Sequence, residues 1–468
     1  MAGPDPRDAA ARLAAGIPPS VVGIIDRLRD HGHAAYLVGG SLRDALLARE
    51  PADWDLATDA RPPQVLDLFP GAVYENRFGT VVVRRDGAVF EITTFRLEHD
   101  YADHRRPHRV EFGDDLEADL ARRDFTVNAL AWGGPPFGDD GGRDAILIDP
   151  FGGLRDLGAG TLRAVGDPLA RLHEDALRMV RAVRLAATHD LSIEAGTLAA
   201  IAANATLVAH VSGERVGAEL SQLMGAPRPS VGLRVAANTG LLAVIIPELA
   251  AQRGIPQNKV PGEDLWDHTL RSVDAAPRER RVVRLAALFH DVGKPATLAD
   301  GRFHHHDVVG AEQAAAILRR LRFSKATVED VAHLVRHHMF AVEADPSGTA
   351  VRRFIRRIGR EHVDALFELR RADDVGSGLA PDDPATAAFR ARVDAELAAG
   401  PVLDRGALAV DGGDLIRDLG LEPGPRLGHV LDALLERVIG DPALNDRGTL
   451  MLLAQGMLAD MPDDEVVA

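Results

Sequence analysis

The chain contains no cysteine. This absence excludes disulfides, thiolate nucleophiles and zinc held by sulfur, so any metal site must use histidine and carboxylate ligands. No apolar run approaches the ~18 residues of a membrane span, and even Leu241–Ile246 stops at Pro247. The first thirty residues lack the charged and apolar regions of a secretory signal. We therefore expect a cytoplasmic protein with no membrane partner.

Lysine is almost as scarce, because it occurs only at positions 259, 294 and 325 and nearly all basic charge comes from arginine. Acidic residues number 70 against 54 basic ones, which gives a formal net charge of −16. This balance argues against a broad, nonspecific nucleic-acid binder. It still allows a local basic groove.

The 468 residues exceed what one hydrophobic core usually holds, so several domains are expected. Up to about residue 150, apolar strands expected at 35–38, 79–84, 89–93 and 146–148 alternate with helices, and from about 167 helical periodicity dominates. The fold class is thus α+β, multidomain, with a mixed sheet and helices in a small head followed by all-α regions. We expect a loose N-terminus (1–20), a head (21–155), a helical neck (156–260), a histidine-bearing domain (261–380) and a helical tail (381–468).

Asp53 and Asp55 are the most informative residues of the head. On a strand, residues i and i+2 point to one face, so both carboxylates can reach shared ions, as two-metal nucleotidyl transfer requires. Upstream, Gly39 and Gly40 would let backbone N–H groups approach a phosphate, and Arg43 adds a forked donor. Either pattern alone is more often a tight turn or a solvated acidic loop. Their order and spacing together favour a metal and triphosphate site.

Further polar residues follow in the head. Glu91 could supply a third carboxylate, although an exposed strand residue fits the alternation equally well. The polar loop 100–107 would suit a mobile lid. A short segment then carries four candidate nucleotide-binding residues, namely Arg122, Arg123, Asp124 and Asn128, and its two arginine forks would be natural clamps for triphosphate or ribose.

Four motifs in order carry a family resemblance: Gly39-Gly40-Ser41-Leu42-Arg43-Asp44, Asp53-Trp54-Asp55-Leu56-Ala57-Thr58, Arg122-Arg123-Asp124-Phe125-Thr126-Val127-Asn128-Ala129 and Asp149-Pro150-Phe151-Gly152-Gly153-Leu154-Arg155-Asp156. Over about 35–225 the chain resembles the class II bacterial CCA-adding tRNA nucleotidyltransferase and poly(A) polymerase family, whose head is DNA polymerase beta-like. The resemblance implies that Asp53 and Asp55 bind Mg²⁺, that Gly40 and Arg43 hold triphosphate, and that Arg122 and Arg123 contact the nucleotide. It also implies a hinge at 149–156.

Asp175 and Arg178 are a candidate base-reading pair, with Arg181 beside them. At a spacing of three residues they are expected to share a helix face. Cytosine and adenine both offer an amino donor beside a ring-nitrogen acceptor. Uracil and guanine instead offer a carbonyl acceptor beside a ring N–H donor. A carboxylate and a guanidinium can therefore accept C and A and oppose U and G without a template. A surface salt bridge is the structural alternative. At 100° per residue, Arg184 falls on the opposite side of the helix from Asp175.

Later histidines and aspartates resemble the HD phosphohydrolase superfamily in their order. The resemblance implies that His268, His290, Asp291 and Asp373 hold one divalent ion and that His306 and His338 extend the site toward a second. Such ligands suit Mn, Fe, Ni or Co better than calcium, and Lys294 could neutralise a phosphate. A helical body that only positions RNA is the alternative. The segment with Arg352, Arg353, Arg356 and Arg357 suits RNA phosphates, or a solvated helix paired with acids.

The sequence thus predicts a Mg²⁺-dependent tRNA nucleotidyltransferase that adds CCA to tRNA 3′ ends from CTP and ATP and releases pyrophosphate. The nearest alternatives are a poly(A) polymerase and an enzyme that adds only CC or only A. From other classes come an HD phosphodiesterase or phosphatase with a nucleotide-binding head and a noncatalytic RNA-binding protein. The sequence does not indicate the oligomeric state.

Overall fold

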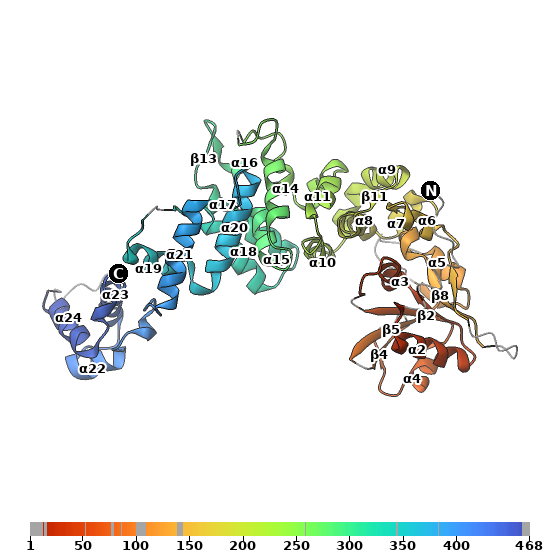
Figure 1. Cartoon of the computed structure of the whole chain (residues 1–468), viewed down its shortest axis with the longest axis horizontal. Coiled ribbons are helices and arrows are strands. Elements are labelled where there is room, and N and C mark those ends of the chain that lie inside the picture. The colour runs from red at the N-terminus through yellow and green to blue at the C-terminus, as the bar shows by residue number, and fades with distance from the viewer. Residues whose placement is uncertain are drawn as a thin grey trace. The chain divides into compact units, whose positions relative to one another are not determined.

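The structure is a computed structural model, and it describes residues 13, 16–51, 53–75, 79–85, 87–99, 109–137, 144–257, 259–342, 345–381 and 383–460. The lid predicted at 100–107 and most of the N-terminal segment predicted to be loose lie outside these residues. The chain divides into unit 1 (1–251 and 317–323) and unit 2 (252–316 and 324–468), whose elements are labelled in Figure 1. None of the described helices is long and apolar enough to cross a membrane.

A mixed seven-stranded sheet organises the head, in the order β3-β4-β5-β2-β1-β8-β9. The strands are β1 (Ala35–Val38), β2 (Trp54–Thr58), β3 (Val73–Tyr74), β4 (Thr80–Arg85), β5 (Ala88–Thr94), β8 (Ala131–Gly134) and β9 (Ile146–Ile148). Only the pairing of β2 with β5 is parallel within this sheet. The predicted α+β class with a mixed sheet in the head is confirmed.

Side chains alternate between the two faces of the sheet along each strand. A hydrophobic cluster covers each face. Leu37 and Leu56 belong to one core cluster, whereas Tyr36, Val38 and Ala57 belong to another on the opposite face. The first cluster includes buried residues of α2 (Pro19–Asp30), α3 (Gly39–Leu46) and α4 (Pro62–Leu68). The second cluster includes Leu120 of α5 (Leu116–Ala121). Strands β6 (Arg96–His99) and β7 (Arg109–Phe112) form a separate two-stranded sheet, and η1 (Thr126–Asn128) follows α5 in the chain.

The remainder of unit 1 is mainly helical. It contains α6 (Gly153–Gly158), α7 (Pro168–Glu174), α8 (Leu177–His189), α9 (Ala195–Asn204), η2 (Ala205–His210), α10 (Gly213–Leu223), α11 (Pro229–Asn238), α12 (Leu241–Ile245) and α13 (Pro247–Ala250). The sequence did not predict its short parallel ladder of β10 (Thr161–Leu162) and β11 (Ser192–Ile193). Helix α11 packs closely on α8, since a Cβ at Gly232 would lie 2.5 Å from the Val183 carbonyl oxygen.

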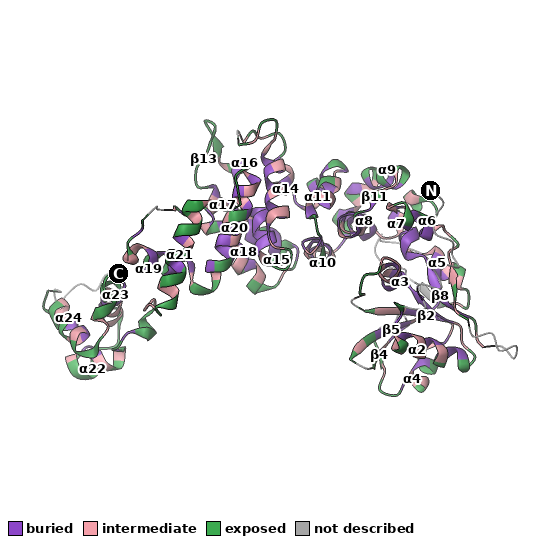
Figure 2. Ribbon diagram, in the orientation of Figure 1, coloured by how far each residue is buried: buried purple, intermediate pink, exposed green. Residues whose placement is uncertain are grey.

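Unit 2 is built from helices whose buried faces meet inside, as the purple segments of Figure 2 show. Its elements are α14 (Leu265–Ala275), α15 (Arg281–Phe289), α16 (Lys294–Thr297), β12 (Leu298–Ala299), β13 (Arg302–Phe303), α17 (His306–Arg320, whose last turn belongs to unit 1), α18 (Lys325–His337), α19 (Gly348–Ile358), η3 (Arg360–His362), α20 (Val363–Gly376), α21 (Pro384–Ala398), η4 (Arg405–Ala407), α22 (Gly412–Leu419), α23 (Pro425–Gly440), η5 (Pro442–Leu444) and α24 (Arg447–Asp460). Helices α14, α15, α18 and α20 pack together.

Candidate functional site

A cavity of about 680 Å³ in unit 1 brings the predicted nucleotide residues together. Its walls include all ten of them: Gly39, Gly40, Arg43, Arg122, Arg123, Asp124, Asn128, Asp175, Arg178 and Arg181. Asp55 and Glu91 also line it, whereas Asp53 does not. Five segments separated in the chain (39–43, 55, 91, 122–128 and 175–181) therefore meet at one polar cavity.

The head carboxylates lie on adjacent parallel strands. Asp55 of β2 pairs in register with Glu91 of β5, so both side chains leave the same face of the sheet. Burial raises the pKa of Asp55, and the charge of Asp53 raises it further. The pKa of Glu91 is also raised, by burial and then by Asp55. Mutually repelling carboxylates of this kind fit a divalent cation.

The head carboxylates are nevertheless more widely spaced than a closed metal site. Among the described residues, sets of three ligand atoms within 4.8 Å of one another occur only in unit 2. Asp53 is exposed and precedes β2 by one residue. The backbone N–H of Asp55 donates to Ser41 Oγ at 3.1 Å, which fixes the start of β2 against the glycine turn.

The glycine turn needs glycine at its first position. Gly39 has a φ of +71°, and a Cβ there would lie 2.9 Å from Arg123 Nη1. Helix α3 begins at Gly39, two residues before the expected Ser41. Arg43 on this helix is buried, and it donates to Asn128 Oδ1 at 2.6 Å and to Asp44 Oδ1. Burial lowers the pKa of Arg43, and Asp44 partly offsets this effect.

Asp119 holds the paired arginines, and sequence reasoning missed this role. Its buried carboxylate accepts hydrogen bonds from Arg122 Nε and Nη2 at 3.0 and 2.6 Å, and Arg123 Nη2 lies 3.4 Å from the other oxygen. Burial alone would raise its pKa, but the two arginines lower it. The spacing of three and four residues on a helix was the available signal.

Asp124 and Asn128 form a second buried group. Asp124 Oδ1 accepts hydrogen bonds from the Phe125 N–H and from Asn128 Nδ2, while Arg181 Nε lies 3.1 Å from Asp124 Oδ2. Burial would raise the pKa of Asp124, yet Arg181 and Asn128 lower it. In this structure the two side chains therefore hold arginines as well as lining the cavity.

Asp175 does not lie on the helix that carries Arg178, so the prediction of a shared helix face was wrong. Asp175 has an extended backbone between α7 and α8, and its carboxylate accepts a hydrogen bond from the Leu177 N–H at 3.0 Å, at the start of α8. It is paired with Arg215 of α10, while Arg178 donates to Glu174 at 2.6 Å. Arg184, expected on the opposite side, lines the same cavity. The helical wheel failed because Asp175 is outside the helix.

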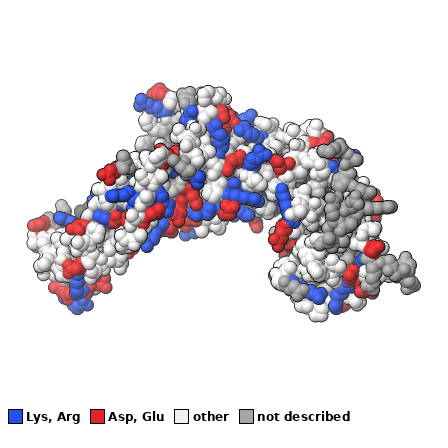
Figure 3. All heavy atoms as spheres, in the orientation of Figure 1, with Lys and Arg blue, Asp and Glu red and all other residues white. Residues whose placement is uncertain are grey.

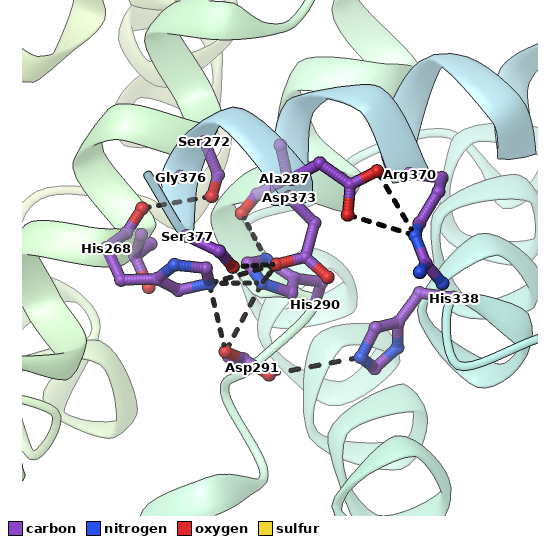
Figure 4. A network of polar contacts seen from close by, with 12 residues as sticks. His268, Ser272, Ala287, His290, Asp291, His338, Arg370, Asp373, Gly376 and Ser377 are labelled. Atoms are coloured by element: carbon purple, nitrogen blue, oxygen red, sulfur yellow. Dashed lines mark hydrogen bonds and ion pairs between the residues drawn. The ribbon is translucent and has the colours of Figure 1, made fainter. Parts of the chain in front are cut away.

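The HD residues converge in unit 2, and Figure 4 shows most of them. His268, His290 and Asp373 form one set of three possible ligand atoms, and Asp291, His306 and His338 form another. Asp291 connects the sets, since its Oδ2 lies 3.3 Å from Nε2 of His268 and of His290. Its Oδ1 lies 3.5 Å from His306 Nε2 and 3.9 Å from His338 Nε2. The predicted grouping of Asp291 with His268, His290 and Asp373 is therefore corrected.

Hydrogen bonds outside the cluster orient three of the imidazoles. Nδ1 of His290, His306 and His338 each donates to a backbone carbonyl three residues earlier, at 2.7 to 2.8 Å. Their Nε2 atoms are thereby left as possible ligands, the usual second contact of a metal-bound histidine. Nε2 of His306 and His338 are buried without a hydrogen-bond partner. These orphaned nitrogens fit a transition metal.

The electrostatics of this cluster agree with a cation site. Burial by itself would lower the pKa of His290, but Asp291 and Asp373 raise it to about 10. In contrast, burial lowers the pKa of His338 to about 4. Lys294 Nζ lies 2.7 Å from Asp291 Oδ2 and is almost fully buried.

Only some of the arginines predicted to form a basic face on α19 are exposed. Arg352 is buried and donates to the Ile439 and Gly440 carbonyls and to Glu396, which corrects its assignment to RNA. Arg353 and Arg356 are exposed and both contact Glu436, while Arg357 is exposed beside the Phe354 ring. Basic and acidic side chains are interspersed on the face drawn in Figure 3.

Known families match four partly overlapping ranges of the chain. Residues 35–163 match the poly A polymerase head domain, and residues 233–375 match the HD domain. Residues 190–253 match the probable RNA and SrmB-binding site of polymerase A, and residues 306–454 match domain 2 of tRNA nucleotidyltransferase.

Individual relatives cover nearly the whole chain. The CCA-adding enzyme of Geobacillus thermodenitrificans is 34% identical over 91% of this chain and 94% of that enzyme. The CCA-adding enzyme of Lactiplantibacillus plantarum is 33% identical over 93% and 95%. The crystal structure of Bacillus stearothermophilus CCA-adding enzyme in complex with CTP superposes with a TM-score of 0.70 at 30% identity, over 95% of this chain and 99% of that one. The chain belongs to the CCA-adding enzyme family, and it is a tRNA nucleotidyltransferase.

Proposed function

We propose that this chain adds CCA to tRNA 3′ ends from CTP and ATP in the unit 1 cavity and releases pyrophosphate. The observation that carries the proposal is that one cavity of about 680 Å³ has carboxylates, several arginines and the Asp175–Arg178 pair in its walls. The similar Bacillus stearothermophilus enzyme is described in complex with CTP. The names of the relatives favour CCA addition over poly(A) synthesis.

Asp53, Asp55 and Glu91 would hold Mg²⁺. The bound metal would lower the pKa of the attacking 3′-hydroxyl and neutralise the leaving pyrophosphate. Register pairing of Asp55 with Glu91 supports this assignment, as does the raised pKa of both groups. The tRNA 3′-hydroxyl attacks the α-phosphate in line, and the β- and γ-phosphates leave together.

The basic wall of the cavity would bind the nucleotide. Arg43 and the backbone of Gly39 and Gly40 would hold the triphosphate, and Arg122 and Arg123 would contact the rest of the nucleotide. Because Asp119 accepts hydrogen bonds from Arg122 and pairs with Arg123, their guanidinium groups are oriented before substrate arrives. Preorganised cations of this kind stabilise developing charge without reorganisation.

Asp175 and Arg178 would read the base. The carboxylate accepts from the exocyclic amine of cytosine or adenine, and the guanidinium donates to the neighbouring ring nitrogen. Arg215 holds Asp175 and Glu174 holds Arg178, so these partners are positioning residues. Asp124 and Asn128 would orient Arg181 and Arg43 in the same way.

The second candidate function is metal-dependent phosphohydrolysis at the HD cluster. Two sets of three ligand atoms and two orphaned imidazole nitrogens favour it. Mn, Fe, Ni or Co would be held by His268, His290 and Asp373, with Asp291, His306 and His338 at a second position. The metal would supply an activated water and charge for a phosphate group. His290→Ala should remove this activity and leave nucleotide incorporation intact.

The decisive experiment uses tRNA ending at the discriminator base, Mg²⁺, and CTP, ATP or both, with products resolved at single-nucleotide length. Addition of three residues that requires both nucleotides would support the proposal. Long A tails or partial addition would select a different subclass.

The exposed Arg353, Arg356 and Arg357 would contact tRNA phosphates. We also propose a cytoplasmic location, because tRNA, CTP and ATP occur in the cytoplasm.

A further inference from the structure

Two of the three lysines of this chain contact the HD cluster. Every other fixed cation is arginine, yet Lys294 Nζ lies 2.7 Å from Asp291 and Lys259 Nζ lies 3.6 Å from Asp373. The third, Lys325, has an 88% exposed side chain and lies near Glu329 on the surface of α18. Lysine is a compact, strongly hydrated charge that suits a small anion, whereas arginine needs room for a planar fork.

Lys259 lies where solvent reaches the cluster. The side chains of His268, His290, Asp291 and His338 are at most 2% exposed, whereas those of Asp373 and His306 are 15% and 11% exposed. Lys259 stands at this accessible carboxylate, is itself 35% exposed, and donates to Ser377 Oγ at 2.8 Å. A substrate that approaches on the side of Asp373 therefore meets Lys259 before the buried ligands.

The segment that carries Lys259 is anchored on both sides. The Gly254 N–H donates to Asp264 Oδ2 at 2.7 Å, and the Leu265 N–H donates to the Ile255 carbonyl at 2.8 Å. From the same segment, Gln257 Nε2 contacts Asp291 Oδ2 at 3.3 Å. This attachment holds Lys259 beside the cluster, while its aliphatic stem leaves the ammonium group free to change partners.

We propose that Lys259 is a phosphate-binding residue of the HD site. The inference rests on the proposed metal site. A cation bound at Asp373 would neutralise the carboxylate that now attracts Lys259, and the ammonium group would turn to the phosphate. Lys259 thus adds to Lys294 a second positive charge for the anion.

The test measures binding and needs no turnover. Full-length protein carrying Asp55→Ala, which removes the proposed head metal site, is titrated with Mn²⁺ by electron paramagnetic resonance. Inorganic phosphate is then titrated into the Mn²⁺-loaded protein and followed by ³¹P relaxation. Lys259→Met is compared with Lys325→Met, which removes an exposed lysine away from the cluster.

Lys259→Met should raise the Kd for phosphate about tenfold, as loss of one charged hydrogen bond predicts. The Kd for Mn²⁺ should stay the same or fall, because the competing ammonium group is gone. Lys325→Met should change neither. An unchanged phosphate Kd, or equal weakening of metal and phosphate, would overturn the role of Lys259. Mn²⁺ binding that is absent, or insensitive to His290→Ala, would instead overturn the metal site and the inference with it.

Discussion

Arg215 Nη2 donates to Asp175 Oδ2 at 2.6 Å, and Arg215 Nη1 lies 3.3 Å from the other carboxylate oxygen. The contact joins α10 to the short break between α7 and α8. A two-pronged contact fixes the plane of the carboxylate as well as its position. The orientation of a candidate base-reading group is therefore set by a residue 40 positions away in the chain.

Arg215→Ala should weaken the choice of base. Asp175 would rotate more freely, and we expect the preference for CTP over UTP to fall about tenfold, as the loss of one charged contact implies. Competition assays with both nucleotides measure the ratio. Arg228→Ala, which removes an exposed arginine paired with Asp190, is the control. Equal loss of incorporation for every nucleotide would show that Arg215 acts on the fold instead.

Asp55→Asn should abolish nucleotide incorporation, by at least about 10³-fold, because an amide cannot replace an ionised ligand of Mg²⁺. Single-turnover primer extension on tRNA checks this. Asp67→Asn on the exposed side of α4 should leave the rate within a factor of two. Retained incorporation by the Asp55 variant would refute the central assignment of the head.

Asp119→Asn should raise KM for both CTP and ATP about tenfold, since Arg122 and Arg123 lose their shared carboxylate. Initial-rate kinetics give KM and kcat separately. Glu117→Gln lies on the same helix but is exposed, so it serves as the matched variant. If KM is unchanged and only thermal stability falls, Asp119 supports α5 rather than nucleotide binding.

The stability of unit 1 should fall as pH is lowered from 6.5. Burial, reinforced by Arg43 and Arg49, lowers the pKa of His189 from 6.5 to about 3. Between pH 6.5 and about 3, His189 therefore binds a proton in the unfolded chain but not in the folded one. The free energy of unfolding decreases by up to about 1.4 kcal/mol for each pH unit in this range. His189→Asn should flatten the difference between pH 7 and pH 5 in urea unfolding. An identical pH slope for both proteins would contradict the assignment.

Arg352→Ala should destabilise unit 2 by about 2–4 kcal/mol, because it leaves buried carbonyls and Glu396 without their donor. Chemical denaturation of the full chain measures this change. Arg357→Ala, on the exposed part of the same helix, should alter stability by less than about 0.5 kcal/mol and weaken tRNA binding in a salt-dependent way. A larger loss of stability from Arg357→Ala than from Arg352→Ala would contradict the buried, structural role of Arg352.

Much of the candidate site was visible in the sequence. Several candidate groups consist of residues that are close together in the chain, so the sequence alone reveals them. They are Asp53 with Asp55, the glycine turn, the paired arginines and His290 with Asp291. The four strand ranges predicted for the head agree with β1, β4, β5 and β9 to within one residue, since alternation and glycine breaks mark them. Strand β8 and the sheet of β6 and β7 were not predicted. Neither was the ladder of β10 and β11, because two-residue strands carry no periodicity.

The chain by itself determined which chemistry is available: no cysteine, so oxygen and imidazole ligands, with motifs in the order of the family. Only the tertiary structure decided the partners. It aligned Glu91 with Asp55 and took Asp175 out of the helix and onto Arg215. It also placed Asp291 with His306 and His338, within 3.3 Å of two ligands of the other set, and it buried Arg352. These outcomes depend on register and packing between distant segments, which local spacing does not encode.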